Sequence, residues 1–306
     1  MQILNTIVPI FVVIMTGLVL RRQNFLPASV LGPLNRLVFY LAIPAMIFHK
    51  VASAAWETHF QPILVLTTLV PVLVVFVLVL ALSPFTPVSH QDRGSFLQCA
   101  VHGNLGYIGL AVCFYALGDE GLTRASILAG FLMLVQNILS VLSLILSQGK
   151  GGQPWSLGFL ATKIVVNPVI LSALAGLFFS LADLRLPLLL ARSLEIVSGM
   201  ALPLALLVIG ASLSFGLLRL HLLPALIAGG IKLVILPCLG LVGAVLLTGL
   251  DLQVFAPALL LLAAPTATVS VVMAREMHGA PDLASAAVAL NTLLSAVSYT
   301  LWLSLL

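Results

Sequence analysis

Two interruptions of long apolar segments contain the residues best suited to bind a solute. The first lies within residues 101–112, where three glycines fall within seven positions and Asn104 stands among them. The second is the run Ala-Pro-Thr-Ala-Thr at residues 264–268. Glycine and proline release backbone groups from the helical hydrogen-bond ladder. In hydrocarbon such breaks persist only where protein or a wet cavity satisfies them. Two breaks at matching places in two halves of a chain predict a transporter binding site.

Seven residues in or next to these breaks are the candidate substrate-binding residues: Gly103, Asn104, Gly106, Pro265, Thr266, Thr268 and Ser270. Hydroxyl groups that border a proline lie where backbone donors are already loosened. The N-terminal ends of half-helices also direct N–H groups toward an anion. All nine acidic residues fall in loops or at the ends of apolar segments. A neutral to positive site of this kind favours a carboxylate ligand.

Two ionisable residues, Lys232 and His102, are open to alternative interpretations. Lys232 falls about ten residues into an apolar segment, where a charge costs on the order of 3 kcal/mol on insertion scales. It either extends to the membrane interface, helped by Gly229 and Gly230, or acts as a countercharge for an anion or for the carbonyl end of a broken helix. His102 adjoins the first break and either titrates or is a packed, hydrogen-bonded side chain, which we favour.

Five amide side chains inside the apolar segments serve either as hydrogen-bonding groups between helices or as ligands. They are Gln98, Gln136, Asn137, Asn167 and Asn291. The three cysteines, Cys99, Cys113 and Cys238, show no C-x-x-C spacing. We expect them to be small buried apolar side chains, and we expect neither a metal site nor a cofactor.

The composition places these features in a membrane. Hydrophobic residues make up 61% of the 306 residues and charged residues 7%, against roughly 25% charged in soluble domains; the mean hydropathy is +1.24. Ten apolar runs have about the 20 residues that cross a bilayer: 3–20, 35–52, 61–82, 95–117, 125–147, 159–181, 192–214, 222–248, 253–274 and 283–305. The sequence therefore predicts an all-α polytopic membrane protein with ten transmembrane helices. The net charge of +4 contains no basic run, so no nucleic-acid partner is expected.

The distribution of positive charge predicts the orientation in the membrane. Lysines and arginines at the loops and helix ends number eight on one side and four on the other. Positive residues accumulate in cytoplasmic loops, so both termini are predicted to be extracytoplasmic in the plasma or inner membrane. The loop that begins at Gln148 is then cytoplasmic.

A shift of 159 residues suggests an internal repeat. It aligns Pro9 with Pro168, Gly17 with Gly176, and Pro44 with Pro203. A unit of five helices is odd and must repeat with inverted topology, which places a binding site between the halves. We therefore predict a first repeat at 1–147, a cytoplasmic linker at 148–158 and a second repeat at 159–306. The single prolines within spans are equally open to interpretation as simple kinks.

Several stretches together resemble the auxin efflux carrier family of transporters, which includes bacterial proteins described as malonate and malate permeases. They are Val-Pro-Ile-Phe at 8–11 with Gly17 and Arg21-Arg22, residues 37–45, Asn-Leu-Gly-Tyr-Ile-Gly at 104–109, Lys-Ile-Val-Val-Asn-Pro at 163–168, residues 264–268 and residues 284–302. The resemblance implies a five-plus-five inverted repeat shared with bile-acid and sodium–proton transporters. In that fold the broken fourth and ninth helices cross, and helices one, two, six and seven form a scaffold. The family's crossover asparagine and proline motifs map onto Asn104 and residues 265–268.

These features together predict a secondary active transporter that moves a small organic anion, a mono- or dicarboxylate, by alternating access. The expected partners are that anion and the lipid bilayer, with a homodimer left open. A passive channel or membrane assembly subunit is the alternative. An intramembrane enzyme is disfavoured because the sequence has no G-x-S-x-G, no H-E-x-x-H and no clustered aspartates.

Overall fold

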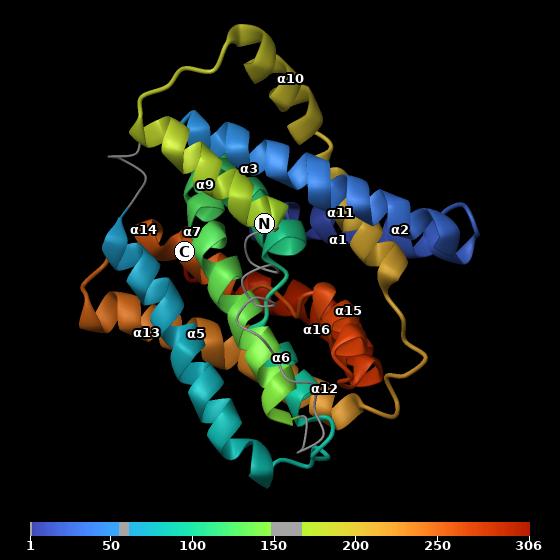
Figure 1. Cartoon of the computed structure of the whole chain (residues 1–306). Coiled ribbons are helices and arrows are strands. Elements are labelled where there is room, and N and C mark those ends of the chain that lie inside the picture. Colours follow the sequence, from blue (N-terminus) through green and yellow to red (C-terminus); the bar gives the residue numbers. More distant parts are fainter. Residues whose placement is uncertain (1, 55–60, 148–166) are drawn as a thin grey trace.

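The computed structural model describes residues 2–54, 61–147 and 167–306. The elements of these ranges are helices joined by turns and loops (Figure 1). Strand-type pairing in these ranges is limited to an isolated antiparallel bridge between Gly103 and Thr266. Seven helices of the described ranges are long and apolar enough to cross a membrane: Ile3–Arg22, Ala28–Ala52, Pro62–Phe85, Leu105–Leu146, Leu188–Ser212, Leu222–Leu247 and Pro281–Leu303. Two shorter apolar helices are Pro168–Leu181 and Leu252–Leu262. The chain is therefore an all-helical polytopic membrane protein.

Two of the predicted spans are interrupted, as the glycine and proline runs predict. Helix α6 (Arg93–Val101) stops before the π-helical segment η3 (Leu105–Gly109), and α14 (Leu252–Leu262) stops before α15 (Val269–Glu276). Element α7 (Leu110–Ser147) consists of two helices joined at Gly118, which has a φ of 69°. Glycine accepts this left-handed conformation without steric cost. The first helix completes the predicted fourth span, and the second is the predicted fifth span. The predicted linker at 148–158 and the start of the predicted sixth span lie outside the described residues.

The remaining helices follow the chain in order. In the first half they are α1 (Gln2–Arg22), α2 (Ala28–Leu37), η1 (Val38–Ala42), α3 (Ile43–Ala52), α5 (Pro62–Leu82) and η2 (Ser83–Phe85). In the second half they are α9 (Pro168–Leu181), α10 (Leu188–Ser198), α11 (Ala201–Ser212), α12 (Leu222–Gly230), η4 (Ile231–Ile235), α13 (Leu236–Val242), η5 (Gly243–Leu247) and α16 (Pro281–Leu303).

A proline in the eighth predicted span creates a contact between helices. Pro237 stands at the start of α13, directly after the π-helical segment η4. A proline has no N–H, so the carbonyl four residues earlier loses its usual helical partner. That carbonyl belongs to Leu233, and it accepts a hydrogen bond of 2.9 Å from the indole N–H of Trp302 on α16. The backbone group released by the proline is thus satisfied by a neighbouring helix, as hydrocarbon requires.

Glycines allow two helix pairs to pack at close range. A Cβ atom at Gly17 of α1 would lie 2.2 Å from the carbonyl oxygen of Leu207 on α11. A Cβ atom at Gly176 of α9 would lie 3.2 Å from the carbonyl oxygen of Phe48 on α3. Small residues permit this approach, on which helix association in lipid depends.

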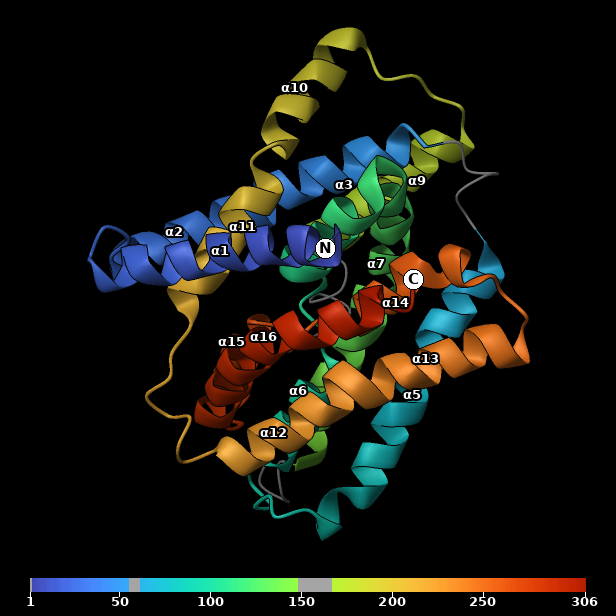
Figure 2. The ribbon, with the colours of Figure 1, turned by 180° about the vertical axis from the view of Figure 1, so that it is seen from behind.

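The helices form two groups that can be followed in both views (Figures 1 and 2). Helices α1, α2, α3, α9 and α11 lie together in the upper part and are called the first group below. Helices α5, α12, α13 and α16 lie in the lower part with the interrupted helices, and are called the second group. Helix α7 passes from one group to the other. The helix breaks therefore belong to the second group, beside the first.

Candidate functional site

The two helix breaks meet each other. The backbone N–H of Asn104 donates to the carbonyl of Pro265 at 2.7 Å, and the N–H of Ala267 donates to the carbonyl of His102 at 2.9 Å. These two bonds form the antiparallel bridge between Gly103 and Thr266. Each break satisfies backbone groups that the other has released, so the interruptions are tolerated inside a membrane-spanning structure. We call this meeting point the crossing.

Thr266 anchors the crossing to two further helices. Its hydroxyl donates to the carbonyl of Cys99 on α6 at 2.9 Å and accepts a bond of 2.8 Å from the amide nitrogen of Asn291 on α16. Asn291 reaches this position because Gly229 of α12 has no side chain; a Cβ atom there would lie 2.3 Å from the Asn291 Oδ1. Asn291 is therefore part of the crossing and not a remote packing residue.

Lys232 is buried at the crossing. It belongs to the π-helical segment η4, its side chain has 0% exposure, and its Nζ donates to the carbonyl of Leu262 at 2.5 Å. Leu262 is the last residue of α14. A Cβ atom on Gly103 would lie 3.0 Å from the Lys232 Nζ, so the ammonium adjoins both breaks. The side chain does not extend to the interface, and the geometry matches the alternative of a countercharge for the carbonyl end of a broken helix.

His102 is packed and hydrogen-bonded, in agreement with the interpretation favoured from the sequence. Its ring is buried, and the Nδ1 lies 2.6 Å from the hydroxyl oxygen of Ser140 on α7. Its carbonyl also accepts the bond from Ala267 described above. His102 therefore joins α7 to the crossing.

Two amide nitrogens next to the first break are buried and have no hydrogen-bond partner in the described structure. They are the Nδ2 of Asn104, whose side chain is 5% exposed, and the Nε2 of Gln136 on α7. The Gln136 Oε1 accepts a bond of 3.1 Å from the N–H of Gly103, which fixes the amide so that its donor end is left over. An unpaired buried donor costs about 1–3 kcal/mol. Gln136 and Lys232 both adjoin Gly103, the residue before Asn104. The Oδ1 of Asn291, an acceptor, is also buried without a partner in the described structure.

The other predicted residues occupy different places around the crossing. Gly106 lies in η3, where a Cβ atom would be 3.3 Å from the Met133 Cε, so its role is close packing against α7. Thr268 is half-buried at the N-cap of α15 and makes no side-chain capping bond. Ser270 is fully buried in α15, and its hydroxyl has no partner in the described structure. Gly103, Asn104, Pro265 and Thr266 are thus brought together, with Lys232 and His102 beside them.

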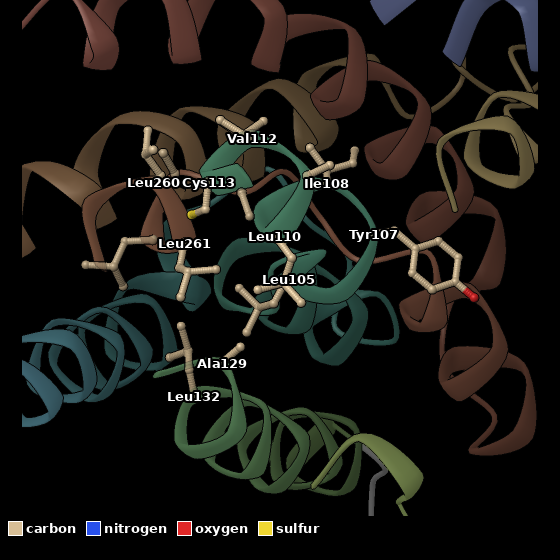
Figure 3. Packing of buried hydrophobic residues seen from close by; sticks show 14 of the residues in the cluster. Leu105, Tyr107, Ile108, Leu110, Val112, Cys113, Ala129, Leu132, Leu260 and Leu261 are labelled. Carbon is tan, nitrogen blue, oxygen red and sulfur yellow. The ribbon is translucent and has the colours of Figure 1, made fainter. Parts of the chain in front are cut away.

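The segment that follows the first break is held by apolar packing. Leu105 and Leu110 lie toward Leu261 of α14, with Leu132 of α7 nearby (Figure 3), and Ile108 is buried on the other side of the segment. Tyr107 turns away from these leucines (Figure 3), and its hydroxyl donates to the Oδ1 of Asn35 on α2 at 2.6 Å. This bond connects the crossing to the first group of helices. The pair of Asn35 and Tyr107 was not predictable from the sequence, because nothing in their spacing relates residues 72 positions apart.

The crossing contains the buried side chain of Lys232. No acidic residue of the described ranges is buried, and two ion pairs, Lys50 with Asp119 and Arg124 with Glu120, involve exposed carboxylates. The described residues also contain no group of three or more His, Cys, Asp or Glu side chains that could hold a metal. Cys99 and Cys113 are buried as expected, but the expectation is wrong for Cys238, which is exposed on α13, because an outward helix face is apolar in a membrane too.

These features define a polytopic membrane protein whose interrupted helices meet beside a buried lysine. The chain belongs to the auxin efflux carrier family, because the family model described as "Membrane transport protein" matches residues 2–303. The resemblance found from the sequence motifs is thereby confirmed.

Two relatives extend over nearly the full chain. A protein of Rhizobium meliloti (strain 1021) named "Putative malonate transporter" is 28% identical over 305 residues, which cover 98% of this chain and 94% of that protein. A protein of Methanothermobacter thermautotrophicus named "Uncharacterized transporter" is 27% identical over 307 residues, 97% of this chain and 96% of that protein. The family and both names indicate a membrane transporter.

Proposed function

We propose that this protein is a secondary active transporter that carries a small organic anion, a mono- or dicarboxylate, across the cell membrane by alternating access. The observation that carries the proposal is the pair of unpaired amide donors, on Asn104 and Gln136, beside the buried ammonium of Lys232. A carboxylate accepts hydrogen bonds and carries negative charge, so it matches both properties of this site. The name of the Rhizobium relative, a "Putative malonate transporter", supports the same class of substrate.

We further propose that the fold is a five-plus-five inverted repeat with crossed fourth and ninth helices. Equivalent elements recur 159 residues apart: α6 begins at Arg93 and α14 at Leu252. The close-packing contacts recur as well, because Gly17 approaches Leu207 while Gly176 approaches Phe48. Gly17 and Gly176 are 159 residues apart, and so are Phe48 and Leu207. The proposed repeats are residues 1–147 and 159–306, and the proposed linker, 148–158, is outside the described ranges.

Alternating access would arise from movement of the second group of helices against the first. The site belongs to the second group, and the Tyr107–Asn35 hydrogen bond links it to α2 of the first group. Such a link between two packed bodies is the kind of contact that breaks and re-forms when one body moves. Counterflow of labelled malonate in proteoliposomes separates this mechanism from a passive channel, which would show no counterflow.

In the proposed orientation the protein lies in the inner or plasma membrane, and both of its termini are on the extracytoplasmic side. This orientation is supported by the eight-to-four distribution of positive residues. Single cysteines are introduced at Gln148 and Gly151 in a variant of the protein without its native cysteines. In intact cells they should resist membrane-impermeant thiol reagents. Labelling without permeabilisation would reverse the orientation.

The substrate site is tested by removing the Asn104 amide. A charge-assisted hydrogen bond is worth about 1.5–3 kcal/mol, so Asn104→Ala should weaken malonate binding by roughly 10- to 150-fold. Calorimetry measures the affinity of the purified protein for malonate and for a panel of other mono- and dicarboxylates. Asn5→Ala is the matched control, because Asn5 is exposed on α1; Asn291 is unsuitable, since it bonds to Thr266. Wild-type affinity in folded Asn104→Ala protein would remove the site from the crossing.

A further inference from the structure

The carbonyl end of α14 is occupied by a side chain where a transported cation would otherwise bind. In secondary transporters with broken helices, the C-terminal ends of half-helices coordinate the coupling cation, because the helix dipole is negative there. Here the Lys232 Nζ donates to the carbonyl of Leu262, the last residue of α14. We propose that the Lys232 ammonium is a tethered substitute for a coupling cation, so that the anion is carried without sodium. This inference rests on the proposed function and adds that anion transport is not coupled to sodium.

The surroundings of Lys232 are shaped for an ammonium. The side chain is fully buried, and the absence of a side chain at Gly103 leaves room for it, since a Cβ atom there would lie 3.0 Å from both the Cε and the Nζ. The π-helical turn η4, which ends before Pro237, carries the residue. An ammonium provides three donors, and the Leu262 carbonyl uses one of them.

Within the described ranges, no acidic side chain forms an ion pair with Lys232. Every acidic residue of the described ranges is exposed or half-buried, whereas Lys232 has 0% exposure. A sodium ion that entered the crossing would lack a carboxylate ligand and would be repelled by the ammonium. Two like charges a few ångströms apart in a medium of low dielectric constant repel strongly. The crossing therefore accommodates one cation, and the chain supplies it.

The end of the other interrupted helix supports the assignment by contrast. At α6 the carbonyl of Cys99 is satisfied by the neutral hydroxyl of Thr266. The residue 159 positions before Lys232 is Leu73, which is exposed on α5. The ammonium is thus an addition to one half and is not required by helix breaking as such.

The transport experiment uses wild-type protein and Lys232→Ala in proteoliposomes, with counterflow of labelled malonate. Wild-type rates should stay within about 2-fold when sodium is replaced by choline on both sides, because no site for sodium is used. Lys232→Ala should lose roughly 10- to 150-fold, the worth of a charge-assisted bond. Propylammonium replaces the deleted atoms and should raise the counterflow rate of Lys232→Ala by about tenfold or more. Propan-1-ol, which has the same shape and no charge, should restore none, and Lys50→Ala, which alters the ion pair with Asp119, should behave as wild type.

Thermal unfolding supplies a second readout that needs no substrate. Propylammonium chloride should raise the Tm of Lys232→Ala above its value in choline chloride of equal ionic strength, while the wild type shows no such difference. A sodium requirement of the wild type, wild-type rates in Lys232→Ala, or a Tm without response to propylammonium would overturn the inference. If wild-type protein neither binds nor exchanges any carboxylate, the proposed function fails instead, and the Tm comparison still decides whether Lys232 fills a cation site.

Discussion

The two interrupted helices end at the same place, yet their carboxyl ends are satisfied by groups of different charge. The end of α6 receives the hydroxyl of Thr266, and the end of α14 receives the ammonium of Lys232. The backbone of the crossing is nearly symmetric, since each break donates one N–H to a carbonyl of the other. Hydrogen bonds between the two breaks and from a neutral hydroxyl are therefore sufficient to close a break in a membrane. The lysine is a separate feature, because a neutral hydroxyl suffices at the end of α6.

The first group of helices shows the opposite behaviour, because its two halves are alike. Glycine contacts of the same kind join α1 to α11 and α3 to α9. These contacts only bring helices close together. The first group therefore has equivalent packing in its two halves, whereas the crossing has different capping groups at its two helix ends.

The largest effect on stability is expected from Thr266→Val. The substitution leaves the Cys99 carbonyl and the Asn291 amide nitrogen without their partner, and each buried orphan costs about 1–3 kcal/mol, so the loss is about 2–4 kcal/mol if the packing partly adjusts. Thermal unfolding in detergent measures it. Thr266→Ser keeps the hydroxyl and is the control. A Thr266→Val protein as stable as wild type would mean that the α6 end needs no capping group.

A smaller effect is expected from Gly229→Ala, which tests how α12 approaches the crossing. The new Cβ would stand 2.3 Å from the Asn291 Oδ1, so the amide must move and its bond to Thr266 is strained. Overpacking of this kind costs about 1–3 kcal/mol. The neighbouring Gly230 offers a matched control, because a Cβ there meets nothing within 4 Å. If Gly230→Ala lowers the Tm as much as Gly229→Ala, helix propensity and not the contact with Asn291 would be the cause.

The smallest effect is expected from Gly103→Ala, which sharpens the comparison at the α14 end. The new Cβ would lie 3.0 Å from the Lys232 Cε and Nζ, and a flexible side chain yields at a cost of about 1 kcal/mol. In a Lys232→Ala background this crowding is absent. The two substitutions should therefore be non-additive in malonate counterflow and in Tm, as contacting residues are. Additive effects would show that Gly103 is needed for its backbone conformation alone.

Much of this molecule was predictable from the order of its residues. The apolar runs identify membrane-spanning helices because the free energy of transferring each residue into hydrocarbon depends mainly on that residue's own chemistry. The breaks at Gly103 and Pro265 were predictable because glycine and proline act on their own backbone. The described ranges bury no carboxylate, as the positions of the acidic residues in loops and at span ends predicted. These are local properties, and a local property needs no knowledge of the neighbouring helices.

The tertiary structure decided which groups meet. Lys232 and Leu262 are 30 residues apart, Gly103 and Gln136 are 33, and Cys99 and Thr266 are 167. Spacing along the chain left Lys232 open between the interface and a helix end, and Gln136 open between packing and binding. It also failed for Cys238, because hydropathy does not distinguish a face toward lipid from a face toward protein. Hydrogen bonds are short and directional, so only the packing of α6, α7, α12 and α14 determined that one carbonyl end receives a hydroxyl and the other an ammonium.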